Sequence, residues 1–353
     1  MPGLKGSIMA GCLPGRAVAA ALIVCLWSGA VQAGTLSLII ENDIFTGTDK
    51  NYTAGNKLAW TSEEARDPAD LVTGAFGRTL AGVFYGIETI RARNDDGDPG
   101  TDIVIHEDFA LGHSIFTPQD ITTPKPLPDQ HPYAGWLYGS YSMVVAHENL
   151  LDTFAVELGV VGPSAFGEEV QRGWHQILDG EDPEGWDHQL KDEPGITLIY
   201  QRQWRYDLRN SVGRFGFDIL PTAGGSLGNI LTQANMGATI RAGYNLGNDY
   251  GPPRIRPALA GSAILDRNAQ GVSLYLFGGV EGRAVLRNIF LDGNSFRDSL
   301  NVQRKPVVAD FQVGAVFKTR TFQLAYTYVI RTEEFDGQEE PQKFGALNLS
   351  VRF

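Results

Sequence analysis

The last ten residues of the chain alternate between apolar and polar side chains up to the final phenylalanine. Because successive side chains of a strand point to opposite faces, this segment has one apolar and one polar face. The apolar face carries Leu347, Leu349, Val351 and Phe353, and the polar face carries Asn348, Ser350 and Arg352. An apolar outside, a polar inside and a C-terminal aromatic residue are typical of the closing strand of an outer-membrane β-barrel.

Alternating segments of about ten residues recur along the whole chain, as they do in transmembrane barrels. The clear ones are Thr35–Asp43, Tyr52–Ser62, Asp102–Phe116, Ala134–His147, Thr153–Gly162, Ile196–Tyr206, Gly213–Ala223, Ala234–Tyr244, Val272–Leu286, Ala309–Lys318, Phe322–Arg331 and Phe344–Phe353. A further candidate, Arg256–Ile264, is weak because Pro252, Pro253 and Pro257 disturb its start. We therefore predict an all-β fold, an antiparallel transmembrane β-barrel of about 12 strands. A soluble sandwich would alternate as well and is the alternative fold.

The N-terminus has the features of a signal peptide. Lys5 and Arg16 precede an uncharged apolar run, and Val31-Gln32-Ala33 offers small residues for cleavage. We expect residues 1–33 to be removed and residues 34–353 to form the barrel domain. Both cysteines, Cys12 and Cys25, lie in the removed segment, so the mature chain would have no disulfide or thiol chemistry.

The charge balance excludes one class of partner. The formal net charge of the whole chain is −12, and loss of the two basic residues of the signal segment makes it more negative. An acidic chain of this kind does not favour nucleic acid. An anionic glycolipid partner would need local basic residues or a bridging divalent cation.

If both termini are periplasmic, the odd-numbered connections face outward, and the outward segment 163–195 carries a predicted helix. The helix is expected over Phe166–Leu178, after Pro163 and Ser164 and before Gly180. His175 shares one face of this helix with Gln171. A histidine there is a candidate general base with a pKa near neutrality. Two periplasmic segments, 63–101 and 245–271, are unusually long and receive no function from the sequence.

The first hairpin ends in a cluster of oxygen-bearing side chains. Asn42 and Asp43 close the first strand, and Thr53 opens the returning one. An ordinary polar hairpin is one interpretation, but carboxylate, amide and hydroxyl oxygens together also suit a hard cation. The predicted topology places Asn42, Asp43, Thr53 and His175 at the same outer rim. A cation that polarises an ester carbonyl while His175 deprotonates water would give metal-assisted hydrolysis without a covalent intermediate.

Several motifs resemble those of the LpxR-like lipid A deacylases. They are END-x-F followed by TD-x-x-YTAG in the first hairpin, LG-x-x-IFTP at Leu111–Pro118, PYAGWLY at Pro132–Tyr138, GP-x-A-x-G-x-E-x-Q-x-x-x-H at Gly162–His175, GW-x-x-Q at Gly185–Gln189 and GNI-x-TQ at Gly228–Gln233. The resemblance runs from the first mature strand to the C-terminus. It implies a twelve-stranded barrel in the bacterial outer membrane with a short helix in an extracellular loop.

The same resemblance implies a calcium-dependent esterase that removes the 3′-linked acyloxyacyl group from the lipid A of lipopolysaccharide. His175 would be the base, Asn42 and Asp43 the calcium and oxyanion residues, and Thr53 would line the site. Glu169 and Gln171 match the helix motif and would orient the histidine. A characterised member of the family has a lysine, suited to a lipid A phosphate, where this chain has about Thr123, so Lys125, two residues on, is the candidate substitute. We expect a monomer.

A serine lipase and a metal site built on other histidines are less consistent with the sequence. His113 and Ser114 suggest a serine lipase, but adjacent strand residues leave on opposite faces and cannot form a dyad. His131 and His188 lack partners at metal-ligand spacing, so structural roles are expected. The competing function classes are an outer-membrane channel or structural barrel without hydrolase activity, and a related phospholipid esterase.

Overall fold

The computed structural model describes residues 33–43, 51–96, 102–178, 181–208, 214–255 and 271–353. Its strands are β1 (Gly34–Asn42), β2 (Asn51–Ser62), β3 (Ile103–Thr117), β4 (Ala134–His147), β5 (Leu150–Val161), β6 (Glu193–Trp204), β7 (Tyr206–Asp207), β8 (Phe215–Gly228), β9 (Leu231–Tyr244), β10 (Ser273–Asn288), β11 (Val307–Lys318), β12 (Phe322–Arg331) and β13 (Gln342–Arg352). The predicted signal peptide and the weak candidate strand Arg256–Ile264 lie outside the described residues.

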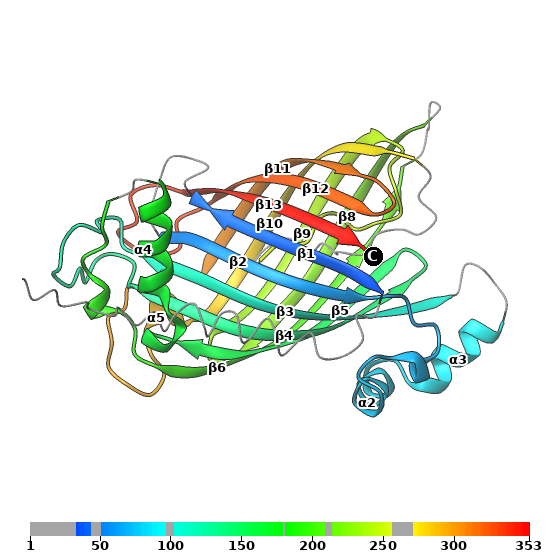
Figure 1. Cartoon of the computed structure of the whole chain (residues 1–353), viewed down its shortest axis with the longest axis horizontal. Helices are drawn as coiled ribbons and strands as arrows, with labels where there is room; N and C mark the ends of the chain where they lie inside the picture. The colour runs from blue at the N-terminus through cyan, green and yellow to red at the C-terminus, as the bar shows by residue number, and fades with distance from the viewer. Residues whose placement is uncertain (1–32, 44–50, 97–101, 179–180, 209–213, 256–270) are drawn as a thin grey trace, which may run out of the picture. The chain divides into compact units, whose positions relative to one another are not determined.

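The strands form one closed antiparallel sheet (Figure 1). Each long strand pairs with its neighbours in sequence, and β13 pairs with β1. β6 pairs directly with β8, and the two-residue strand β7, which follows β6 in the chain, pairs with the beginning of β8. Closure leaves no long edge strand exposed. The prediction of a twelve-stranded barrel is confirmed, with β7 as a short extra strand. Within the described residues, no helix is long and apolar enough to span a membrane.

Alternation along the strands separates an apolar outside from a polar lumen. Exposed outward side chains include Leu36, Leu38, Leu198, Leu276 and Val313, with Phe353 at the end of the last strand. The lumen side is buried and paired: Ser37 bonds Ser350 at 2.8 Å, and Arg241 bonds Asp218 at 2.6 Å. The register of β13 against β1 puts Leu349 opposite Leu38, as the sequence pattern predicts.

Residues 246–255 of the long connection after β9 fill part of the lumen. Asp249 receives ion pairs from Arg241 and Lys318. Farther along, Arg254 lies 2.9 Å from Glu41 of β1, and the backbone N–H of Ile255 donates to the same carboxylate at 3.1 Å. This connection therefore has a structural role that the sequence did not reveal: it closes the barrel interior with buried charge pairs.

The connection after β2 folds into a helical insertion. It contains a 3₁₀ turn, η2 (Pro68–Asp70), and two helices, α2 (Ala75–Phe84) and α3 (Ile87–Asp95). Leu71, Ala81 and Ile90 of the insertion pack on the outward-facing Ile105 and Met143. The insertion lies at the barrel end that holds the C-terminus and the start of β1, where the backbones of Gly34 and Phe353 bond each other.

The opposite, outer end carries the remaining helices (Figure 1). They are η3 (Pro163–Ala165), α4 (Gly167–Leu178), η4 (Trp186–His188) and α5 (Ile289–Asp292). The helix predicted from Phe166 begins one residue later, because Phe166 has a left-handed φ of +58°. The predicted bounds Gly213–Ala223 and Ala234–Tyr244 leave a ten-residue connection that is wrong, since β8 and β9 continue to a two-residue turn. Gly224 belongs to a strand that lies close to its neighbour: a Cβ there would lie 2.4 Å from the carbonyl oxygen of Tyr200.

Candidate active site

Helix α4 starts against the outward side of the barrel wall, not over its mouth. A Cβ on Gly135 of β4 would lie 3.1 Å from both the Cβ of Ala165 and the backbone N of Gly167. His113 of β3 bonds the carbonyl oxygen of Ala165 through Nε2 at 2.8 Å. Ser114 faces the lumen instead, where it lines a cavity. The two side chains leave the strand on opposite sides, so they form no serine–histidine dyad, as expected.

A tryptophan from the following loop fixes the middle of the helix. Trp186 Nε1 donates to Gln171 Oε1 at 2.8 Å, and its ring packs on Tyr133 at 4.9 Å between ring centroids. Gly167 allows this contact, because a Cβ there would lie 2.5 Å from the indole. Gln171 is 2% exposed, and its Nε2 has no hydrogen-bond partner among the described residues. A buried amide N–H of this kind is available to a bound ligand or water.

His175 lies in the last turn of α4 and is half-buried. Its Nδ1 contacts the backbone carbonyl oxygen of Glu181. Since a carbonyl only accepts, Nδ1 carries the proton in this contact and Nε2 is the basic nitrogen. The arrangement fixes the tautomer that a general base requires.

A single row of residues connects the first strand to the helix. Asn42 of β1 pairs with Ala54 of β2, Ala54 with Ile115 of β3, and Ile115 with Gly135 of β4. Residues directly opposite each other point to the same side of a sheet, so Asn42 shares the outward side with Gly135. The row spans three strand spacings, roughly 14 Å. Helix α4, at 1.5 Å per residue, is about 18 Å long and is sufficient to cross it.

Asp43 and Thr53 lie next to this row, one residue farther along their strands toward the outer end of the barrel. Asp43 follows directly after Asn42 and is 1% exposed. Thr53 precedes Ala54 at a register shift between β2 and β3, and its hydroxyl bonds that of Thr117 at 2.7 Å. Asn42, Asp43, Thr53 and Thr117 thus belong to the neighbouring ends of three adjacent strands, and the hydroxyls of Thr53 and Thr117 are in direct contact.

A family comparison decides which group of barrels this is. The model described as "Outer membrane protein LpxR" matches residues 10–353. The chain belongs to the LpxR family. It is accordingly an outer-membrane protein, and the outward side of its barrel faces lipid.

The comparison with solved structures agrees at the level of fold. LpxR from Salmonella typhimurium has a TM-score of 0.68 at 18% identity, covering 90% of this chain and 100% of that chain. The β domain of the Bordetella autotransporter Brka has a TM-score of 0.42 at 8% identity, covering 91% of this chain and 98% of that chain. The translocator domain of the autotransporter NalP from Neisseria meningitidis has a TM-score of 0.37 at 7% identity, covering 96% of this chain and 95% of that chain. A search of curated proteins finds no significant match.

The remaining predicted residues of this LpxR-family chain have distinct positions. Glu169 is exposed on α4, whereas its neighbour Glu168 bonds Arg172 at 3.0 Å. Lys125 is exposed in the β3–β4 loop, which His188 holds through a 3.1 Å contact between Nε2 and the carbonyl oxygen of Pro124. The structure thus brings Gln171 and His175 together on one helix and leaves Lys125 on a separate, exposed loop.

His131 has a structural role, as expected. It is 3% exposed, and its ring stacks on Phe116 at 5.4 Å between centroids. Burial lowers the pKa of His131, so the neutral ring is favoured. Its Nδ1 donates to the backbone carbonyl oxygen of Pro132 at 2.8 Å.

Sequence reasoning missed three residues that build the site. Gly135 leaves room for the start of α4, His113 bonds the segment just before the helix, and Trp186 bonds Gln171 in its middle. All three lie in the motifs PYAGWLY, LG-x-x-IFTP and GW-x-x-Q that the family resemblance used. Their roles depend on contacts between distant segments, which a motif alone does not display.

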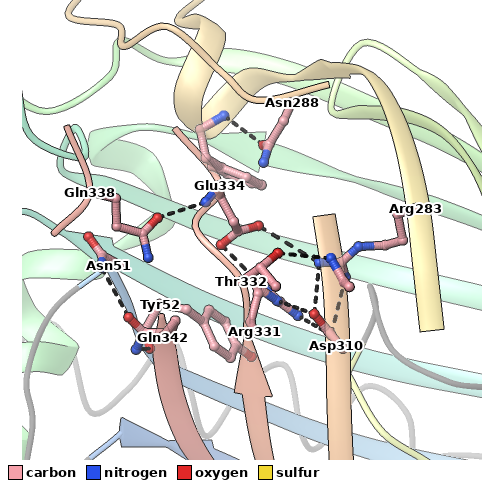
Figure 2. A network of polar contacts seen from close by, with 12 residues as sticks. Asn51, Tyr52, Arg283, Asn288, Asp310, Arg331, Thr332, Glu334, Gln338 and Gln342 are labelled. Carbon is pink, nitrogen blue, oxygen red and sulfur yellow. Dashed lines mark hydrogen bonds and ion pairs between the residues drawn. The ribbon is translucent and has the colours of Figure 1, made fainter. Parts of the chain in front are cut away.

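The lumen behind the site is a separate, charge-paired environment. Figure 2 shows Arg283 and Arg331 both directed at Asp310, with Glu334 beside them. Arg331 Nε lies 2.9 Å and Arg283 Nη2 lies 3.1 Å from Asp310 Oδ1. A cavity of about 70 Å³ lies on this side of the wall, lined by residues such as Tyr52, Ser114 and Glu281. Because the wall separates this cavity from α4, it is not the candidate site.

Proposed function

We propose that this LpxR-family protein hydrolyses an ester of lipid A, removing the 3′-linked acyloxyacyl group with calcium as cofactor. Family membership supports a lipid A deacylase in general. The observation that carries the specific proposal is the row from Asn42 to Gly135, which runs along the lipid-facing side of the wall to the foot of α4. A substrate anchored in the outer leaflet can reach this side without entering the barrel.

His175 would act as the general base. With Nδ1 donating to the carbonyl oxygen of Glu181, Nε2 can take a proton from water as the water oxygen attacks the ester carbonyl. The tetrahedral intermediate then expels the 3′-oxygen of the sugar, which receives the proton from the imidazole. The products are a free acyloxyacyl acid and a 3′-hydroxyl on lipid A, so atoms and charge balance.

The residues at the end of β1 fit calcium in kind. Asp43 supplies a buried carboxylate, and Asn42 and Thr53 add amide and hydroxyl oxygens, which are the ligands that calcium accepts. The described residues contain no group of three or more acidic, histidine or cysteine side chains that could hold a metal. One carboxylate with amide, hydroxyl and backbone oxygens is therefore the expected donor set. When bound, the ion would stabilise negative charge on the ester carbonyl oxygen.

Two further residues would support the substrate. The Gln171 Nε2 group, buried and without a protein partner among the described residues, would donate a hydrogen bond inside the site. Lys125, exposed on the loop next to η4, would meet a lipid A phosphate.

The test is mass spectrometry of lipid A from cells that express wild type, His175→Ala, Asp43→Ala or the matched control His147→Ala. Lipid A from cells with wild type and the control should lose an acyloxyacyl mass, because His147 lies at the opposite end of the barrel, where it ends β4 and contacts Arg93. The two site variants should retain it, since loss of a general base costs about 10²- to 10⁴-fold in rate. Barrel folding is checked by heat-dependent gel mobility. Cleavage that survives His175→Ala would refute the mechanism. Unchanged lipid A in cells with folded wild-type protein would contradict the proposal that lipid A is the substrate.

A further inference from the structure

The helical insertion between β2 and β3 covers two carboxylates on the lipid-facing side of the wall. Glu107 of β3 accepts from the backbone N–H of Thr73 at 3.1 Å and from Tyr141 at 2.8 Å. Asp152 of β5 accepts from Tyr85, at the end of α2. Both carboxylates are fully buried. Charges exposed on the lipid face of a barrel are costly, so the insertion completes the wall at this point.

The side of α2 that faces the barrel carries small residues. Gly77 and Ala81 are the buried residues of the helix, and a Cβ on Gly77 would lie 2.8 Å from Glu107 Oε1. Small residues let the helix backbone lie close to the strands. The helix axis is therefore held directly against the outward surface of β3 to β5.

Three large apolar side chains of α2 remain exposed beside this contact. Phe76 is 55% exposed, Val83 71% and Phe84 43%. Three large apolar side chains on one short helix are unusual for a surface that meets only water. Arg78, on the same helix, is exposed as well.

These side chains continue an aromatic band on the barrel itself. Phe84 stacks on Phe154 at 3.9 Å, and Phe154 lies 4.9 Å from Tyr200. Phe76 packs on Tyr141 at 5.5 Å. On the other flank the band runs from Tyr141 through Phe109 to Trp60, with centroid separations of 5.2 and 6.0 Å. Outward-facing aromatic rings near one end of an outer-membrane barrel mark the membrane–water interface.

We propose that α2 lies in the inner-leaflet interface of the outer membrane, with Phe76, Val83 and Phe84 in contact with phospholipid. The occupant is argued from continuity: the helix is docked on the lipid-facing wall, and its exposed rings extend the aromatic band of that wall. Arg78 supplies a positive charge for the phosphates beside it. The insertion would thereby fix the depth of the barrel in the membrane from the periplasmic side.

The mature chain is expected to have no cysteine, so single-cysteine variants can report on α2 directly. Val83→Cys is labelled with an environment-sensitive fluorophore and reconstituted into phosphatidylethanolamine–phosphatidylglycerol vesicles, with or without spin-labelled phospholipid as quencher. Leu276→Cys, on the lipid-facing side of β10 and 66% exposed, is the lipid control. Thr89→Cys, exposed on α3, is the water control.

The proposal predicts blue-shifted emission at position 83 and quenching by the lipid-borne spin label comparable to that at position 276, with no quenching at position 89. Emission at 83 that matches the water control would overturn it. Shielding at 83 that spin-labelled lipid does not quench, and that grows with protein density, would instead assign this surface to a second copy of the chain and equally overturn the proposal.

Discussion

Gly135 and Gly139 lie on the same outward side of β4, yet only Gly135 meets another segment. A Cβ on Gly135 would press on Ala165 and Gly167, whereas a Cβ on Gly139 would meet nothing within 4 Å. The position of α4, and with it that of His175, thus depends on a single absent side chain. The sequence showed a glycine in the PYAGW motif, but the need for it comes from a segment about thirty residues away.

Gly135→Val should displace α4 from the wall. Overpacking of this kind costs about 1–3 kcal/mol, and a shift of α4 away from the wall would relieve it. We expect deacylation to fall by about tenfold or more while the barrel still folds. Gly139→Val is the matched control and should keep its activity. Equal activities of the two variants, measured as initial rates on purified lipopolysaccharide, would show that the contact does not position the base.

At the scale of elements, the strands were predictable and the connections were not. Alternation is a property of neighbouring residues, so β1, β12 and β13 follow from the sequence nearly to the residue. The sequence marks the connection 63–101 as unusually long but does not show its helices. This connection is organised by partners far along the chain, Glu107 and Asp152, which no local pattern connects to it. The same reason hid the lumen segment 246–255.

The attachment of the insertion can be weakened without touching the barrel. Tyr85→Phe removes the hydroxyl that donates to Asp152, and an unmade hydrogen bond to a buried charge costs about 1.5–3 kcal/mol. We expect limited proteolysis within residues 63–102 to become faster in vesicles, with unchanged heat-dependent mobility of the barrel. Tyr206→Phe, at a tyrosine that is 55% exposed, is the control and should be cleaved like wild type. A Tyr85→Phe variant as resistant as wild type would contradict this docking.

For the whole molecule, buried charge pairs occupy the lumen, and the candidate site lies on the outward side of the wall. Inside the barrel, Arg254 pairs with Glu41, and Asp249 pairs with both Arg241 and Lys318. The sequence placed Asn42, Asp43, Thr53 and His175 at one end of the barrel, because strand parity determines the end. It did not determine on which side of the wall α4 packs, since that depends on contacts between Gly135, His113 and Ala165.

A filled lumen predicts that the protein is not a pore. Wild type in planar bilayers should show no steady ion conductance. Replacement of residues 247–270 by a short turn should remove the Asp249 and Arg254 pairs and produce measurable conductance. Steady conductance of the wild-type protein would support the channel function that competes with hydrolysis.

We propose above all that calcium-assisted water attack on the ester occurs between the end of β1 and His175. The most direct test of this proposal is the rate of acyloxyacyl release from purified lipopolysaccharide as a function of free calcium, for wild type and Asp43→Asn. We predict a saturable calcium requirement, loss of activity in chelator with recovery on readdition, and a higher calcium requirement for the variant. Full wild-type activity in chelator, or a calcium dependence that Asp43→Asn leaves unchanged, would contradict the account.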